Sequence, residues 1–285
     1  MLNTNNISIS NTSLIDLWLH GKSANTVDGY RRYAERFFTS VGDKPLGEVT
    51  LMDFQLWEVS LKCSDNSKRV AVGAIKSLFS FAKELGIISS NLGILVKSPK
   101  AKNRLAERIL TEEEVQSLIN CATTQRDRVI IRLLYFAGLR VSELCALKWR
   151  DLKDRKDGGG QITVFGKGDK TRAVLVGKGI WREINDLKDY ASKDDPVFVS
   201  REGGHLCRSM VFLIVKNAAK RAGLEGDVSP HWLRHSHASH SLDRGAPIHL
   251  LQKTLGHSSV SITEMYLHAK PTDSSGLYLA DDDDE

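Results

Sequence analysis

Apolar residues recur at helical spacing through most of the first 95 positions of the chain. The members of one such run are Val27, Tyr30, Ala34 and Phe37. They would share one side of a helix and form a buried stripe. A second run covers residues 68–85 and is followed by Gly86, a residue type that commonly ends helices. We therefore expect residues 1–95 to form a small helical bundle.

Helix starts are marked by a small polar residue three positions before an acid, near an apolar-periodic run. The pairs are Ser13 with Asp16, Asn25 with Asp28, Thr50 with Asp53 and, later in the chain, Thr111 with Glu114. In each pair the polar side chain can accept a hydrogen bond from a free N–H group of the first turn. Each pair therefore predicts a capped helix.

The pattern breaks at residues 96–108, which are polar and basic, contain Pro99 and lack apolar periodicity. This segment is the best candidate for a domain boundary. It reads equally as a plain linker or as a basic strap that lies along phosphates, and the two interpretations are compatible. The cations that would contact DNA in the second interpretation are Lys97, Lys100, Lys102 and Arg104.

Periodicity returns after the boundary and then changes type. A long apolar helix is expected from about Asp127 to Gly138, and helices are expected again from Arg208 onward. Between them, residues 161–165 and 172–176 are rich in β-forming residue types and flank the turn 166–170. We expect a mainly α protein with a small antiparallel β-sheet, in which residues 109–285 form a second domain with a short acidic tail.

Composition narrows the classes of function. The formal charge of +5 becomes +10 when the five acidic residues 281–285 are left out, and a basic body suits a polyanionic partner. No apolar run reaches the ~20 residues that a membrane-spanning helix needs, and the first residues lack the order of a signal peptide. The four cysteines are far apart and have no metal-ligand spacing. We therefore expect a cytoplasmic protein with no membrane partner and with no metal site built on its cysteines.

The residues with the most informative chemistry lie in the second half of the chain. Ser229 and Pro230 favour a helix start, which would put His231 and Arg234 on one helix face. Further along, Leu255-Gly-His257 ends a short apolar helix, and Tyr266 follows nine residues later. Upstream, the stretch Gly138-Leu-Arg-Val-Ser-Glu-Leu144 places Arg140 at a helix break, where a cation and free N–H groups can meet an anion together.

These motifs, in this order, closely resemble the catalytic domain of the tyrosine recombinase family, especially its Xer-like and phage-integrase branch. The family has an Arg in Gly-Leu-Arg-x-x-Glu-Leu, a Lys in a β-hairpin, a His-x-Leu-Arg-His motif, a Leu-Gly-His motif and a Tyr nine residues later. The matching residues here are Arg140, Lys167, His231, Arg234, His257 and Tyr266. The N-terminal segment matches the family's core-binding domain in length and pattern.

The resemblance implies a role for each matching residue. Tyr266 would attack a DNA phosphate and form a 3′-phosphotyrosyl bond, so that neither ATP nor a metal is needed. Two arginines, Arg140 and Arg234, would neutralise the non-bridging oxygens, with His257 donating a further hydrogen bond. His231 would receive or steer the tyrosyl proton, and Lys167 would protonate the leaving 5′ oxygen.

Supporting residues are less sharply defined by the motifs. Glu143 matches the family's position behind Arg140, and His235 and His237 are expected to orient neighbours or to pack. Lys170 is the alternative to Lys167 as general acid, although the Gly-Lys-Gly pattern favours Lys167. The glycines at 158–160 lengthen the loop before the second strand and could alter how Lys167 is presented.

As partners, the resemblance implies double-stranded DNA with a short inverted repeat and a tetramer that pairs two such sites. The two domains would clamp the DNA. A type IB topoisomerase, whose catalytic domain is similar, is the nearest competing enzyme. A catalytically idle DNA-binding protein is the competitor from another class. A zinc hydrolase built on His231, His235 and His237 has no acid at ligand spacing to support it.

Overall fold

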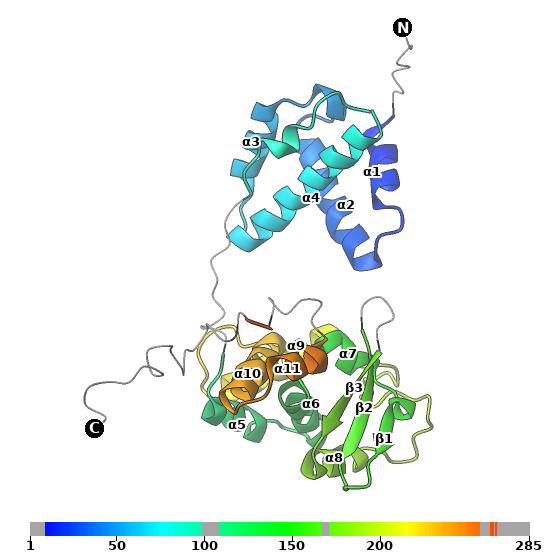
Figure 1. The fold of residues 1–285 in the computed structure, drawn as a ribbon, viewed down its shortest axis with the longest axis vertical. Helices are drawn as coiled ribbons and strands as arrows, with labels where there is room; N and C mark the ends of the chain where they lie inside the picture. The colour runs from blue at the N-terminus through cyan, green and yellow to red at the C-terminus, as the bar shows by residue number, and fades with distance from the viewer. Residues whose placement is uncertain (1–8, 99–108, 167–170, 257–262, 265, 267–285) are drawn as a thin grey trace, which may run out of the picture. The chain divides into compact units, whose positions relative to one another are not determined.

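The computed structural model describes residues 9–98, 109–166, 171–256, 263, 264 and 266. The chain divides into two compact units, residues 1–103 (unit 1) and 104–285 (unit 2), and each is described by itself (Figure 1). The combination of a helical first unit with a mainly helical second unit that holds one small antiparallel sheet confirms the predicted fold class. None of the helices in the described ranges combines the length and apolar character needed to cross a bilayer.

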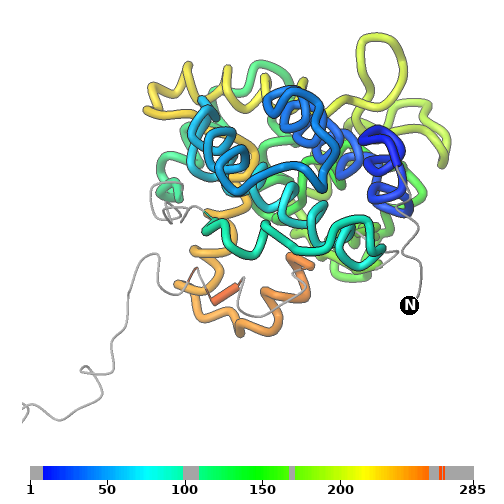
Figure 2. Tube along the Cα trace, turned by 90° about the horizontal axis from the view of Figure 1, so that it is seen from above, coloured from blue at the N-terminus to red at the C-terminus, as the bar shows by residue number. Residues whose placement is uncertain are grey.

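Unit 1 consists of helices that pack around a cluster of aromatic rings. Its elements are α1 (Asn11–Leu19), α2 (Ala24–Ser40), η1 (Leu46–Glu48), α3 (Leu51–Ser60), α4 (Asp65–Glu84) and η2 (Leu92–Ile94). The Cα trace in Figure 2 follows α1, α2 and α4 from blue to cyan as they fold back on one another. Phe37 of α2, Phe54 of α3 and Phe79 of α4 are fully buried at their meeting point. The apolar stripe predicted on α2 is therefore the side that faces this core.

The predicted caps are correct for two helices and wrong for two. Thr50 and Thr111 each form a capping box with the acid three positions later, as expected. Helix α1 is capped by Ser10, which accepts from the Ser13 N–H group, and α2 begins after Ser23. The two wrong predictions, Ser13 and Asn25, lie within the first turn of their helices. Several small polar residues lie near each helix start, and the spacing alone does not distinguish which of them is the cap.

The C-terminal end of unit 1 extends into the segment predicted as a linker. Val96 is buried in the core of unit 1, and its carbonyl accepts a hydrogen bond from Lys76 Nζ at 2.6 Å. Val96, the first residue of the predicted linker, thus packs with unit 1. Most of the predicted linker, residues 99–108, lies outside the described residues.

Unit 2 places helices against a three-stranded sheet. Its elements are α5 (Glu112–Asn120), α6 (Gln125–Phe136), α7 (Val141–Ala146), η4 (Trp149–Asp151), β1 (Leu152–Asp154), β2 (Gly160–Phe165), β3 (Thr171–Val176), α8 (Lys178–Asn185), α9 (Arg208–Arg221), α10 (Pro230–Asp243) and α11 (Ile248–Leu255). The buried helix α6 contacts α5, α7, α8, α9 and α10. In Figure 1 the sheet lies at one flank of the unit and these helices fill the rest.

The sheet has the order β1-β2-β3, and both pairs are antiparallel. The predicted hairpin of 161–165 and 172–176 is correct within one residue at each strand start, whereas the short strand β1 was not predicted. Side chains alternate between the two faces, as a strand requires. The inward-facing positions hold Ile162 and Val164 of β2 and Arg172, Val174 and Val176 of β3.

The glycines at 158–160 serve the other end of the hairpin from the segment that carries Lys167. Gly160 is the first residue of β2, and a Cβ atom there would lie 1.8 Å from the Trp181 ring. Trp181 also donates a hydrogen bond from Nε1 to Asp154 Oδ1 at 2.8 Å. The glycines therefore allow α8 to pack closely on the β1–β2 end of the sheet, while residues 167–170 follow the opposite end of β2.

Candidate active site

Seven of the residues singled out in the sequence lie within the described part of unit 2. They are Arg140, Glu143, His231, Arg234, His235, His237 and Tyr266. Lys167, Lys170 and His257 fall outside the described residues, as do Lys100, Lys102 and Arg104. Lys97 is described and is exposed near the end of unit 1.

Arg140 stands at the start of α7, directly in front of Glu143. Its backbone N–H donates to Glu143 Oε2 and its Nη1 donates to Glu143 Oε1, both at 2.9 Å. The Glu143 side chain is only 4% exposed, whereas that of Arg140 is 36% exposed. Glu143 therefore lies behind Arg140, in the position that the resemblance implies, and leaves the guanidinium accessible from one side.

The backbone before Arg140 needs the glycine at position 138. Gly138 has a φ of +57°, and a Cβ atom there would lie 2.8 Å from both the His237 and Leu255 side chains. The Gly138 carbonyl accepts a hydrogen bond from Arg234 Nη1. The glycine of the Gly-Leu-Arg motif thus lets this part of the chain approach α10 so closely that Arg234 can bind the Gly138 carbonyl.

Arg172 is a third arginine in this region, and the sequence analysis missed it. Its Nη1 and Nη2 donate to the two carboxylate oxygens of Glu143, each at 2.8 Å. The side chain is 12% exposed and occupies the inward-facing position of β3 opposite Val164. An arginine on the apolar face of a predicted strand was the available signal, because a buried cation requires an acidic partner.

The C-terminal end of α11 joins the three arginines, which we call the guanidinium cluster (Arg140, Arg172 and Arg234). Each donates to a different carbonyl there: Arg172 Nε to Thr254 at 2.6 Å, Arg234 Nη2 to Leu255 at 2.6 Å, and Arg140 Nη2 to Gly256 at 2.9 Å. The last carbonyls of a helix lack helical partners and carry the negative end of its dipole. The end of α11 therefore supplies acceptors that collect cations from three distant parts of the sequence.

The electrostatics of the cluster favour an anion. Three guanidiniums and one carboxylate leave a net charge of +2 among these four residues. Burial lowers the pKa of Arg234 to about 10, and the nearby charge of Arg140 adds to this effect, so that Arg234 is still protonated at neutral pH. Burial alone would raise the pKa of Glu143, but hydrogen bonds from Arg172 and from the Arg140 backbone hold it below its ordinary value.

Tyr266 lies against this cluster with its ring in a small apolar pocket. The residue is 4% exposed and packs with Ile109, Ala238, Leu251 and Leu255. Its hydroxyl is 2.8 Å from His235 Nδ1. Burial raises the pKa of Tyr266, whereas the charges of Arg234 and Arg140 oppose that rise. The tyrosine is therefore held neutral at rest, close enough to both arginines for their charges to act on it.

His231 and His235 occupy different surroundings although they share helix α10. His231 is exposed, and its ring centroid is 6.3 Å from that of Phe212. His235, from which the sequence analysis expected an orienting role, is the one that contacts the Tyr266 hydroxyl. The structure thus brings Arg140, Arg234 and Tyr266 together with Glu143 and His235, and it places His231 at the surface of the same helix.

His237 has a packing role within the described site. Burial lowers its pKa to about 4, which keeps the ring neutral at physiological pH, and the ring lies against Gly138 and Leu255. Among the described residues, no three His, Cys, Asp or Glu side chains are grouped in a way that could hold a metal ion. This arrangement gives the alternative of a zinc site on His231, His235 and His237 no support.

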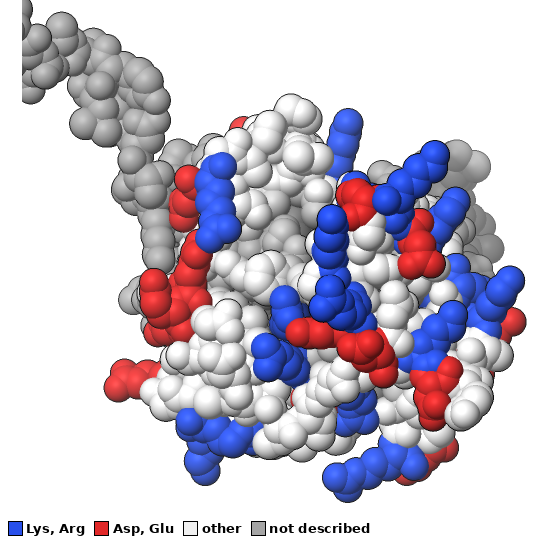
Figure 3. Space-filling view, turned by 90° about the horizontal axis from the view of Figure 1, so that it is seen from below, with Lys and Arg blue, Asp and Glu red and all other residues white. Residues whose placement is uncertain are grey.

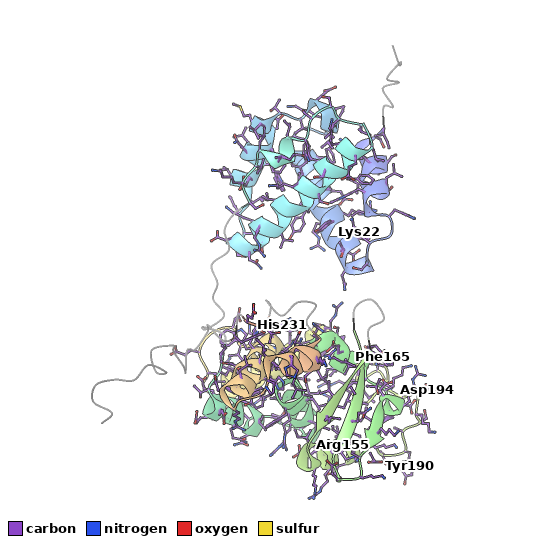
Figure 4. The ribbon with its side chains drawn as sticks, in the orientation of Figure 1. Lys22, Arg155, Phe165, Tyr190, Asp194 and His231 are labelled. Carbon is purple, nitrogen blue, oxygen red and sulfur yellow. The ribbon has the colours of Figure 1, made fainter. Side chains whose placement is uncertain are left out.

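The opposite end of unit 2 has a different surface. Figure 4 shows His231 and Phe165 toward one end of the unit and Arg155 and Tyr190 toward the other. The face in Figure 3 carries basic and acidic side chains interspersed. Arg155 pairs with Asp157 in the β1–β2 turn, for example, and Arg150 pairs with Asp194. A net excess of buried positive charge is therefore found at the guanidinium cluster, and paired charges are found at the far end.

Comparisons with known proteins give a consistent result. The model of the phage integrase family matches residues 108–273. Tyrosine recombinase XerA of Pyrococcus horikoshii is 37% identical over 254 residues, which cover 88% of this chain and 85% of that protein. Tyrosine recombinase XerC of Xylella fastidiosa is 32% identical over 263 residues, with 87% of each chain covered.

Solved structures resemble this chain along most of its length. The crystal structure of XerA recombinase matches with a TM-score of 0.52 and 29% identity, covering 94% of this chain and 95% of that one. A lambda integrase dimer bound to a COC′ core site matches with a TM-score of 0.76 and 20% identity, covering 93% and 98%. At that identity the second likeness concerns the fold alone.

Proposed function

The chain belongs to the phage integrase family and is a tyrosine site-specific recombinase, and from this premise we propose that Tyr266 is the nucleophile that cleaves and rejoins its DNA. One observation carries the assignment. Arg140 and Arg234, far apart in sequence, bind adjacent carbonyls at the end of α11, and the charges of both act on Tyr266. This arrangement supports a site in which Tyr266 would be the nucleophile and the two arginines would bind the phosphate.

The cations supply what phosphoryl transfer requires. A phosphodiester resists attack because its non-bridging oxygens are negative, and negative charge on the reacting group and its entering and leaving oxygens must be stabilised in the transition state. Arg140 keeps an accessible guanidinium, and Arg234 is fixed beneath it by two backbone carbonyls. Donors that are already oriented stabilise the transition state without reorganisation at the moment of reaction. His257 would add a further hydrogen bond to the same oxygens.

We propose that cleavage is a single displacement at phosphorus. A bond forms between Tyr266 Oη and phosphorus, and the bond between phosphorus and the 5′ oxygen breaks. The tyrosyl proton passes to a histidine of α10: His231 is the one that the resemblance implies, and His235, whose Nδ1 is 2.8 Å from the hydroxyl, is the one that contacts it in the structure. Lys167 donates a proton to the departing 5′ oxygen. The phosphotyrosine keeps the ester bond energy, so a 5′ hydroxyl can reverse the step on another strand.

The DNA partner and the assembly belong to the same proposal. Lambda integrase has been solved as a dimer on a core site and as a tetramer on a Holliday junction. We infer that this chain likewise binds the two halves of an inverted repeat and pairs two sites as a tetramer, in the cytoplasm. Unit 1 and the cations Lys97, Lys100, Lys102 and Arg104 would contact phosphates, and unit 2 would carry the chemistry.

The decisive experiment identifies the DNA and the nucleophile together. Purified protein is incubated with fragmented genomic DNA of its source, denatured with detergent, and the covalently attached DNA is sequenced. We expect one sequence with an inverted repeat to be enriched, and a nicked oligonucleotide of that sequence to trap the protein. Tyr266→Phe should bind the oligonucleotide with unchanged affinity and trap none of it.

The control is Tyr190→Phe, because Tyr190 is 99% exposed and lies at the far end of unit 2 (Figure 4). This variant should behave like the unmodified protein. Trapping by Tyr266→Phe, or loss of trapping in the control, would show that the nucleophile is another residue. Covalent attachment without any sequence preference would point to a DNA-relaxing enzyme instead.

A further inference from the structure

The guanidinium of Arg172 donates three hydrogen bonds to other parts of the protein. Its two terminal nitrogens bind both oxygens of Glu143, and its Nε binds the Thr254 carbonyl. Its side chain is 12% exposed, against 36% for Arg140. Three of its five N–H groups are thus used within the protein, and the other two belong to a side chain that is largely buried. Arg172 therefore differs from Arg140, although both bind the same carboxylate.

Glu143 links Arg172 to Arg140, because its carboxylate binds both side chains. The two oxygens of Glu143 receive four recorded donors, two from Arg172 and two from Arg140. A bidentate arginine–carboxylate pair fixes both the distance and the plane of the carboxylate. Without Arg172, Glu143 could rotate about its side chain and Arg140 would lose its fixed partner. The carboxylate would also be left buried with one fewer cation, which disfavours its charged form.

The end of α11 provides a second link between Arg172 and Arg140. Thr254 and Gly256 belong to one turn, and their carbonyls bind Arg172 and Arg140 respectively. Gly256 has a φ of +64°, and a Cβ atom there would lie 3.2 Å from Arg172 Nη1. This close approach of guanidinium and backbone ties β3 to the helix that ends just before His257.

We propose that Arg172 is a positioning residue that holds Arg140 in place for the scissile phosphate by fixing Glu143 and the end of α11. It acts through these groups and does not touch DNA. The inference rests on the proposed function, since it assigns Arg140 to the phosphate. Arg172→Gln should therefore lower the rate of covalent complex formation roughly 100-fold, the order expected when one transition-state donor is lost, and leave DNA affinity unchanged.

Two substrates separate this role from a merely structural one. In a methylphosphonate at the cleaved position, a methyl group replaces one charged oxygen, so the charge that Arg140 neutralises is absent. The defect of Arg172→Gln should then largely disappear, as should that of Arg140→Ala. The defect of Lys167→Ala should persist, because the 5′ oxygen still needs a proton. A 5′-bridging sulfur should rescue Lys167→Ala and not Arg172→Gln.

A double-mutant cycle on the ordinary phosphodiester provides an independent readout. Because Arg172 acts largely through Glu143, Arg172→Gln should slow the reaction much less in a Glu143→Gln background than in the unmodified protein, and the remaining effect belongs to the link through the Thr254 carbonyl. The matched control is Arg155→Gln, since Arg155 also pairs with an acid next to the sheet but lies at the far end of unit 2 (Figure 4). It should retain full activity.

Arg172→Lys covers the case in which the glutamine variant fails to fold, as judged by circular dichroism. Lysine keeps the charge but cannot bind both carboxylate oxygens in one plane, so this variant should also be slow on phosphodiester and recover on methylphosphonate. An equal defect on both substrates, additive effects in the cycle, or equal losses of affinity and rate would overturn the inference. Absence of any covalent complex with the unmodified protein would instead overturn the proposed function.

Discussion

The interiors of the two units are stabilised by different interactions. Unit 1 centres on the rings of Phe37, Phe54, Trp57 and Phe79, whose contacting centroids lie 5.1–6.2 Å apart. Unit 2 has its own apolar core, but beside it Arg234 is 5% exposed and Glu143 6% exposed. Apolar contacts are non-directional and scale with the area removed from water. Buried charges depend on each individual partner.

This difference separates stability from chemistry within one chain. The guanidinium cluster brings like charges together in a buried place, and the lowered pKa of Arg234 shows that folding works against its charged form. A buried charge network of this kind is a poor way to gain stability compared with apolar packing. In the proposed reaction its value lies in the fixed donors that it would present to a phosphate. We therefore expect substitutions in unit 1 to act on folding and those in the cluster to act on the reaction.

The largest expected effect tests that separation directly. Arg234→Ala should slow covalent complex formation at saturating DNA about 1,000-fold, because one preorganised donor disappears and the carbonyls of Gly138 and Leu255 lose their partner. Phe37→Ala should cost about 3–5 kcal/mol of unfolding free energy through the cavity it leaves, with an unchanged rate per folded molecule. Single-turnover kinetics and urea denaturation measure the two quantities. An equal slowing of the reaction by Phe37→Ala would refute the separation.

The sequence predicted those features of the fold that are local. Helical spacing, the hairpin and the stop at Gly256 all depend on residues within a few positions, and each is found where expected. Strand β1 was missed because it has only three residues, Leu152–Asp154, and is defined by pairing with β2. Val96 was assigned to the linker because its burial depends on a contact with the distant helix α4.

The candidate site also combines residues that local motifs predict with contacts that only the fold creates. The order of motifs pointed to Arg140, Arg234 and Tyr266, and the fold brings these three together. No spacing rule could reveal that His235 meets a hydroxyl 31 positions away, or that a strand arginine binds Glu143 and Thr254. Such contacts form only when several elements pack. A family motif therefore predicts candidate reacting residues, and the structure is needed to find the side chains that contact them.

An effect of intermediate size concerns the stability of unit 2 at low pH, which we expect to fall while that of unit 1 does not. The pKa of His237 falls from 6.5 to about 4 on folding, so the folded state binds fewer protons than the unfolded state. The stability that His237 contributes is then complete above pH 6.5 and is lost as the pH falls toward 4. The loss amounts to about 3 kcal/mol, since one pKa unit corresponds to 1.36 kcal/mol.

Hydrogen exchange of the full chain can follow this effect in each unit. Peptides from α6 and α10 should exchange faster at pH 4.5 than at pH 6.5 after correction for intrinsic rates. Peptides from α2 and α4 should show no such change, because the buried core of unit 1 around these helices is built from apolar side chains, which do not titrate. His237→Phe, which keeps a ring against Gly138, should remove the pH dependence. Acceleration in both units alike would contradict the assignment.

The smallest expected effect concerns how the basic segment at the end of unit 1 contributes to DNA binding. Lys97 is exposed and precedes Lys100, Lys102 and Arg104, four cations within eight positions. If Lys97 contacts one phosphate, the Lys97→Gln protein should release one fewer counterion from the DNA when it binds. The slope of log affinity against log salt concentration should then fall by about 0.9, with a weaker affinity for every DNA sequence alike. The rate of covalent complex formation at saturating DNA should not change, because Lys97 takes no part in the chemistry. Lys193→Gln is the control, since Lys193 is equally exposed but adjoins Asp194, which pairs with Arg150. Filter binding at four salt concentrations measures both slopes. Equal slopes for Lys97→Gln and the unmodified protein would assign the segment to a linker without phosphate contacts at this position.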